Sequence, residues 1–155
     1  MDKTEKEAKS TKPGQIGSPE QQTLTLQQAL DLGLQHHTAG ELSKAKETYQ
    51  QILETDSNHP DALHLLGVIS HQTGENDRAV DLITKALAIR PDFAEAHYNL
   101  GATLTELGQL NEAFACYHTA IAIKPDYAEA YNNLGLTLKE LGKLDDAVAS
   151  YHQAL

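Results

Sequence analysis

Glycine recurs in this chain at a fixed interval of 34 residues. The first series comprises Gly33, Gly67, Gly101 and Gly135, and a second runs in step with it at Gly40, Gly74, Gly108 and Gly142. Alanine keeps the same interval at Ala45, Ala79, Ala113 and Ala147. A period of this length is typical of stacked supersecondary units, each of which buries its apolar face against its neighbours. We therefore predict a repeat array rather than a single globular core.

Each unit reads as two helices separated by a glycine. Residues 94–107 carry apolar or small side chains at helical spacing. Gly108 follows, and glycine ends a helix well because it adopts the left-handed conformation without steric cost. A second helix is expected from Asn111 to about Lys124. The same pattern gives units at 26–59, 60–93, 94–127 and 128–155, the last one incomplete, and it predicts an all-α chain without strands.

Polar residues near the expected helix starts suggest N-caps, since their side chains accept hydrogen bonds from the free backbone N–H groups of the first turn. For the second helices we expect Ser43, Asp77, Asn111 and Asp145 in this role. For the first helices, Asp92 and Asp126 stand three residues before a glutamate, which is a variant of the capping box, and Asn58 precedes Asp61 in the same way.

The columns of the third unit resemble the tetratricopeptide repeat. They read His97-x2-Leu100-Gly101-x2-Leu104, then Ala113-x3-Tyr117, then Pro125. The family pattern places leucine–glycine, alanine, an aromatic residue and proline at these positions. The resemblance covers residues 26–155, and it implies a right-handed superhelical solenoid of antiparallel helix pairs. It further implies that the first helices line the concave side and the second helices the convex side.

Composition limits the class of partner. Residues 1–22 are polar, rich in proline and glycine and balanced in charge, so we expect a disordered tail there. The net charge of −10 therefore lies on the repeats, and it repels nucleic acid and anionic membrane surfaces. The sequence has no apolar run long enough for a membrane span, no secretory signal and a single cysteine, Cys116. We expect a cytoplasmic protein.

A concave face of this kind is the usual binding surface of a solenoid. The predicted groove mixes acids, imidazoles, amides and a phenol: Asp61, His64, Glu95, Tyr98, Asn99, Thr105, Glu129, Asn132, Asn133 and Lys139. Because acids outnumber the one lysine in this set, we expect a basic or neutral protein or peptide as partner.

Asn99 and Asn133 occupy one column of the predicted groove, although asparagine is a poor residue for a helix interior. A carboxamide can donate to and accept from the backbone of an extended peptide. The repeat region of O-linked N-acetylglucosamine transferases, which this chain resembles, has asparagines laddered along its lumen. The alternative is that both asparagines bond to a neighbouring loop or helix pair. Both interpretations stay open at this point.

The sequence shows no motif for catalysis, for a cofactor or for a metal ion. A site built from His37, His64 and His71 is geometrically conceivable, but exposed polar histidines are the preferred interpretation, so we expect no metal. We interpret Cys116 as a small packing residue rather than a nucleophile. We therefore expect no enzyme activity and no cofactor.

Three functions remain. The first is an interaction module, scaffold or adaptor that binds a protein segment in its groove. The second is the substrate-recruiting N-terminal region of a longer, glycosyltransferase-like enzyme, which the reading frame past Leu155 would reveal. The third is self-assembly through the C-terminal end, where Val148, Tyr151 and Leu155 are expected to remain uncovered.

Overall fold

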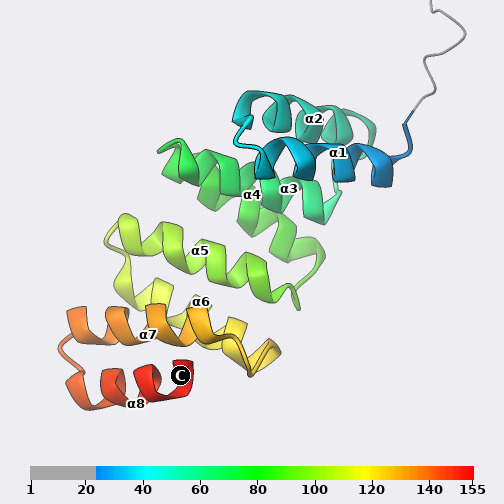
Figure 1. The fold of residues 1–155 in the computed structure, drawn as a ribbon. Helices are drawn as coiled ribbons and strands as arrows, with labels where there is room; N and C mark the ends of the chain where they lie inside the picture. Colours follow the sequence, from blue (N-terminus) through cyan, green and yellow to red (C-terminus); the bar gives the residue numbers. More distant parts are fainter. Residues whose placement is uncertain (1–23) are drawn as a thin grey trace, which may run out of the picture.

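A computed structural model describes residues 24–155, so the prediction of a disordered tail at 1–22 lies outside the described residues. These residues form eight α-helices and no strands, which confirms the all-α prediction (Figure 1). The helices are α1 (Leu26–Thr38), α2 (Leu42–Thr55), α3 (Pro60–Gln72), α4 (Asn76–Ile89), α5 (Ala94–Glu106), α6 (Leu110–Ile123), α7 (Ala128–Glu140) and α8 (Leu144–Ala154).

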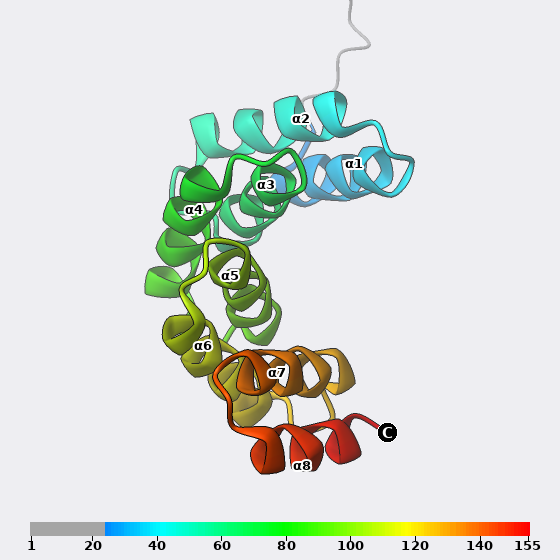
Figure 2. The same cartoon turned by 90° about the vertical axis from the view of Figure 1, so that its left-hand side faces the viewer.

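The helices pack as consecutive pairs that stack into a curved solenoid. Figure 2 shows α1, α3, α5 and α7 on the inner side of the curve and α2, α4, α6 and α8 on the outer side. The main contacts join each helix to the next one along the chain, and α5 also meets both α3 and α7 directly. The first helices thus line the concave side, as the sequence predicts.

The 34-residue glycine series marks the close crossing within each pair. A Cβ added to Gly101 would lie 2.7 Å from Cε1 of Tyr117 on α6, and that ring is almost fully buried. Ala113 and Ala120, on the same helix as Tyr117, are completely buried. Small residues in these columns therefore let two helix backbones approach, while the tyrosine ring fills the space around them.

The second glycine series forms the turns within the pairs. Gly40, Gly74, Gly108 and Gly142 all have φ between 74° and 80°, the left-handed region that favours glycine. The amide of Gly108 donates to the carbonyl of Thr105, and the amide of Gln109 donates to that of Leu104, so the turn closes the end of α5. The predicted role of these glycines is confirmed.

The predicted N-caps of the second helices are wrong. These helices begin directly after the two-residue glycine turn, so their N-caps are Glu41, Glu75, Gln109 and Lys143, none of which makes a side-chain capping bond. The expected caps, Ser43, Asp77, Asn111 and Asp145, therefore lie inside the first turn. Carboxylates there still favour the helix, because they face the positive end of its dipole.

The predicted caps of the first helices are also wrong. Asp92 and Asp126 lie one residue outside the caps of α5 and α7, which are Phe93 and Tyr127 without a capping bond. Asn58 likewise precedes the true cap of α3, His59, whose ring nitrogen accepts from the amide of Ala62 over 3.2 Å. The aromatic rings at positions 93 and 127 pack instead against His64 of α3 and Tyr98 of α5.

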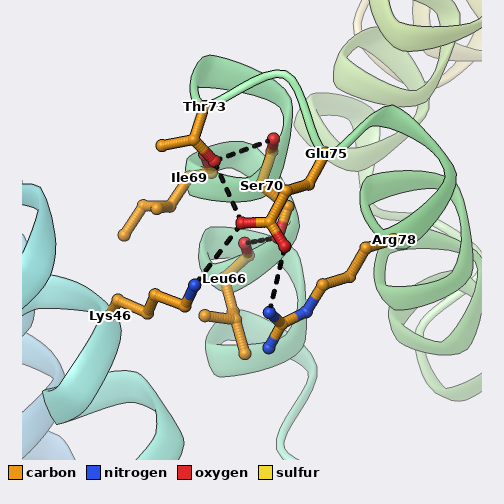
Figure 3. Close-up of polar contacts among 7 residues, drawn as sticks. All are labelled: Lys46, Leu66, Ile69, Ser70, Thr73, Glu75 and Arg78. Carbon is orange, nitrogen blue, oxygen red and sulfur yellow. Dashed lines mark hydrogen bonds and ion pairs between the residues drawn. The ribbon is translucent and has the colours of Figure 1, made fainter.

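Glu75, the N-cap residue of α4, uses its side chain for other contacts than capping (Figure 3). Its carboxylate lies between Lys46 of α2, at 3.4 Å, and Arg78 of α4, at 3.3 Å, and accepts from the Thr73 hydroxyl. These groups, with the hydrogen bond from Arg78 as the largest cause, lower the pKa of Glu75. The carboxylate therefore ties α4 to the preceding helix pair rather than capping its own helix.

Candidate functional site

A hollow opens on the concave side between α5 and α7. Its volume is about 230 Å³. The lining residues are Ala102, Thr105, Glu106, Tyr117, Asn133, Leu136 and Glu140. Leu136 is 46% exposed, and the Thr105 hydroxyl lies 3.2 Å from the Tyr117 hydroxyl. The hollow therefore offers an apolar contact, polar hydroxyl and amide groups, and two carboxylates.

The predicted groove residues differ in how exposed their side chains are to solvent. Glu95, Glu129, Asn132 and Lys139 are exposed, and Asp61, Tyr98, Asn99, Thr105 and Asn133 are partly buried. Of these, Thr105 and Asn133 line the hollow between α5 and α7. His64 is only 6% exposed, so its prediction as an open groove residue is wrong.

His64 is buried because the N-terminal part of α5 packs over it. The Phe93 ring lies against the imidazole with a centroid separation of 4.5 Å, and Asn99 Nδ2 donates to His64 Nε2 over 2.8 Å. Burial lowers the pKa of His64 to about 4, with opposing contributions from Asp61 and Glu95. The ring is thus neutral at pH 7, and its unprotonated Nε2 accepts the bond from Asn99.

The same arrangement recurs one repeat later. Asn133 Nδ2 donates to the Tyr98 hydroxyl over 3.2 Å, and the Tyr98 and Tyr127 rings lie 5.0 Å apart. Both asparagines therefore bond to the helix pair before them, which supports the second of the two interpretations left open by the sequence. Their partners lie 35 residues earlier, and this spacing is the signal in the sequence that could have revealed the contact.

Two other histidines also connect neighbouring repeats. His37 Nε2 lies 2.8 Å from the side-chain oxygen of Gln72, and His71 Nε2 lies 2.9 Å from a Glu106 oxygen. Within residues 24–155 no group of three or more His, Cys, Asp or Glu side chains is arranged to hold a metal ion. The conceivable site from His37, His64 and His71 is thus absent from the described residues.

A larger hollow of about 660 Å³ lies at the end of the stack, over α7 and α8. Glu129, Asn132 and Asn133 line its polar side. Val148, Tyr151 and Leu155, the residues predicted to mediate self-association, line its other side together with His152 and Ala154. The structure therefore brings the predicted end residues together with part of the predicted groove.

Cys116 fits the interpretation as a packing residue. Its side chain is partly buried against the core around Tyr117. Burial, and secondarily Glu112, raise the pKa of the thiol to about 11. The thiol is protonated at neutral pH, whereas a nucleophilic cysteine needs a lowered pKa.

Two sequence profiles match the chain. One, described as "Tetratricopeptide repeat", matches residues 36–102 and 70–116, and another, described as "TPR repeat", matches residues 103–142. No curated protein matches the sequence. No helix within residues 24–155 has both the length and the apolar character needed to cross a membrane.

Solved structures resemble the array over most of its length. The crystal structure of MamA aligns with a TM-score of 0.77 at 28% identity, covering 84% of this chain and 76% of that one. MamA from Desulfovibrio magneticus RS-1 gives 0.75 at 18% identity over 84% and 73%, a likeness of fold alone. An O-GlcNAc transferase mutant from Thermobaculum terrenum gives 0.71 at 28% identity, covering 73% of this chain but only 22% of that one.

Proposed function

Because the chain belongs to the tetratricopeptide repeat family, whose solenoids serve as protein–protein interaction scaffolds, we propose that it binds a peptide segment of a partner protein in its concave groove. The hollow between α5 and α7 carries this proposal. It lies between two of the inner helices and combines an exposed leucine with hydroxyl, amide and carboxylate groups. In this role the chain itself catalyses no reaction.

The charges at the hollow favour a basic or neutral segment. Glu106 pairs with His71 and accepts from Asn76, and these contacts, His71 first, lower the pKa of its carboxyl. Glu140 is exposed and forms no ion pair within residues 24–155. A lysine or arginine of the ligand would meet Glu140, while an apolar side chain would cover Leu136.

A peptide-display selection on the immobilised chain tests this proposal, followed by fluorescence anisotropy of the selected peptides. We expect basic or neutral peptides that contain an apolar residue. Glu140→Lys should weaken their binding about tenfold, since an attraction becomes a repulsion. Raising the salt from about 50 to about 300 mM should also weaken it, because exposed charges are screened.

The matched control is Glu112→Lys, which makes the same charge reversal on the exposed part of α6, and binding should be unchanged. Selection of acidic peptides, or equal effects of the two variants, would contradict the groove as the site.

A second candidate function is recruitment of substrates for a transferase. The 28% identity to part of an O-GlcNAc transferase supports it, although that likeness covers only 22% of the transferase chain. In this case the selected peptides should contain a serine or threonine, because an O-linked sugar is attached to the hydroxyl of one of these residues. Peptides without hydroxyl residues that bind equally well would favour the general adaptor role.

A further inference from the structure

Two glutamates of the groove occupy equivalent positions one repeat apart. Glu106 and Glu140 stand at the ends of α5 and α7, and both line the hollow between these helices. Because α5 and α7 are in direct contact, the step from one inner helix to the next is about 8–10 Å. A ligand that meets both carboxylates therefore needs two cations separated by about this distance.

The two carboxylates differ in the partners that they already have. Glu106 lies 2.9 Å from His71 of the preceding repeat. The residue at the equivalent position before Glu140 is Thr105, whose hydroxyl donates to the Gly101 carbonyl over 2.9 Å. Glu140 forms no ion pair within residues 24–155. Its free charge thus follows from a residue of the preceding repeat, which lies within the described part of the chain.

The N-terminal segment of the same chain has lysines at a fixed interval. Residues 3–12 read KTEKEAKSTK, which places Lys3, Lys6, Lys9 and Lys12 exactly three residues apart. The four lysines outnumber the two glutamates of this segment, whereas the repeats carry the negative charge of the chain. Charge alone therefore favours contact between the two, and the interval of three residues specifies the geometry of that contact.

Polyproline II is the regular conformation that aligns side chains at this interval. It has about three residues per turn and rises about 3.1 Å per residue, so every third side chain points the same way and one turn advances about 9 Å. In a strand, residues three apart point to opposite faces. In an α-helix, each interval of three rotates the side chain by about 60°. A polyproline II ligand with this lysine interval therefore places consecutive lysines one inner-helix step apart.

The chain between the segment and α1 is long enough to reach the groove. Lys9 precedes Leu24, the first described residue, by 15 residues, which span at most about 50 Å when fully extended. The path from the start of α1 to Glu106 crosses two inner-helix steps, about 20 Å, and runs along one 13-residue helix, again about 20 Å. The straight distance is then about 30 Å, well within this reach.

We propose that residues 3–12 bind the concave groove of their own chain in polyproline II geometry, with Lys9 at Glu106 and Lys6 at Glu140. The methylene stems of the two lysines cover Leu136, as long charged side chains do on apolar surface. The tether makes the contact intramolecular, with an effective concentration in the millimolar range, so weak ion pairs suffice. This inference rests on the proposed groove and names a ligand that a partner peptide has to displace.

Paramagnetic relaxation enhancement in the full chain tests the proposal. Cys116→Ser removes the native thiol, and serine already occupies the equivalent position of the next repeat, Ser150. Ala8→Cys then places a spin label between the two lysines. We expect the backbone amides of residues 102–106 and 136–140 to be broadened, and those of the outer helices to be affected far less.

Two variants test the charge and the lysine interval separately. Glu140→Lys should remove most of the broadening, because an attraction becomes a repulsion. The combined exchange of Glu5→Lys with Lys6→Glu and of Lys9→Ser with Ser10→Lys keeps the composition and the charge but leaves no two lysines three residues apart. It should remove most of the broadening as well.

The matched control is Glu112→Lys on the outer helix α6, which should leave the broadening unchanged. Broadening that persists after the combined exchange, or that lies outside the groove, would overturn the proposal. So would broadening in a mixture of spin-labelled and isotope-labelled chains, because the segment would then come from a second copy. The groove proposal survives each of these results, since the selected peptides decide it, and a failed peptide selection leaves the label contact measurable.

Discussion

At the scale of single residues, the close helix crossing at Gly101 is the most sensitive point of the fold. A side chain there meets the Tyr117 ring, which is buried and also close to the Thr105 hydroxyl, so it has little room to move. The gain in helix propensity when glycine is replaced is smaller than the cost of such a clash.

Gly101→Val should therefore lower the free energy of unfolding by several kcal/mol, on the order of 3. Chemical denaturation monitored by circular dichroism measures it. Ala102→Val, the neighbouring position on the partly buried concave face, is the matched control and should change stability far less. A loss below about 1 kcal/mol for Gly101→Val would show that the crossing is not tight.

His64 predicts how stability depends on pH. Its pKa falls from 6.5 to about 4 on folding, mainly through burial. Above pH 6.5 the ring is neutral in both states and adds no pH dependence. Below that value the imidazole binds a proton in the unfolded chain but not in the folded chain. The free energy of unfolding therefore falls as pH decreases toward 4, by about 3 kcal/mol at most.

The measurement is urea denaturation at several pH values between 4 and 7.5. His64→Gln should remove this part of the slope, since glutamine does not titrate. His118→Gln, an exposed histidine on α6, should keep it. An unchanged slope in the His64 variant would argue against a buried neutral imidazole.

At the scale of helices, the stability of each element depends on how many neighbours cover it. Within residues 24–155, α6 packs against both α5 and α7, whereas α8 makes its main contacts with α7 alone. A helix without a second neighbour opens more easily, because less apolar surface is exposed when it does so.

The amides of α8 should consequently exchange with solvent faster than those of α6, although the two helices have similar sequences. Hydrogen exchange followed by mass spectrometry or NMR measures the difference. Equal protection of Leu144–Ala154 and Leu110–Ile123 in the free chain would contradict the expectation.

At the scale of the whole molecule, the stack is linear and its curvature follows from which helices meet. The inner helices α3, α5 and α7 touch across repeats, whereas the outer helices form no contact of comparable extent within the described residues. The inner edge is therefore shorter than the outer edge, and Figure 2 shows the resulting arc. Curvature gathers side chains of several repeats on one concave surface, which no single repeat provides.

The sequence by itself determined the repeat, the helix pairs and the turns, because these depend on local requirements. Gly108 must adopt positive φ, and Gly101 must leave room for Tyr117, whatever surrounds the unit. The resemblance to the tetratricopeptide repeat also predicted that the first helices line the concave side, where Figure 2 shows them. Thr105 and Asn133 of the predicted groove do line the hollow there.

Only the tertiary structure decided which polar residues are exposed to solvent. His64 and Glu129 both belong to the predicted groove, yet the first is buried under Phe93, the N-cap of α5, and the second is exposed on α7. The starts of α5 and α7 also differ from prediction: their N-caps are Phe93 and Tyr127, whose rings pack on His64 and Tyr98 and make no capping bond. Burial of a polar residue depends on its neighbours in space, and a local pattern does not contain that information.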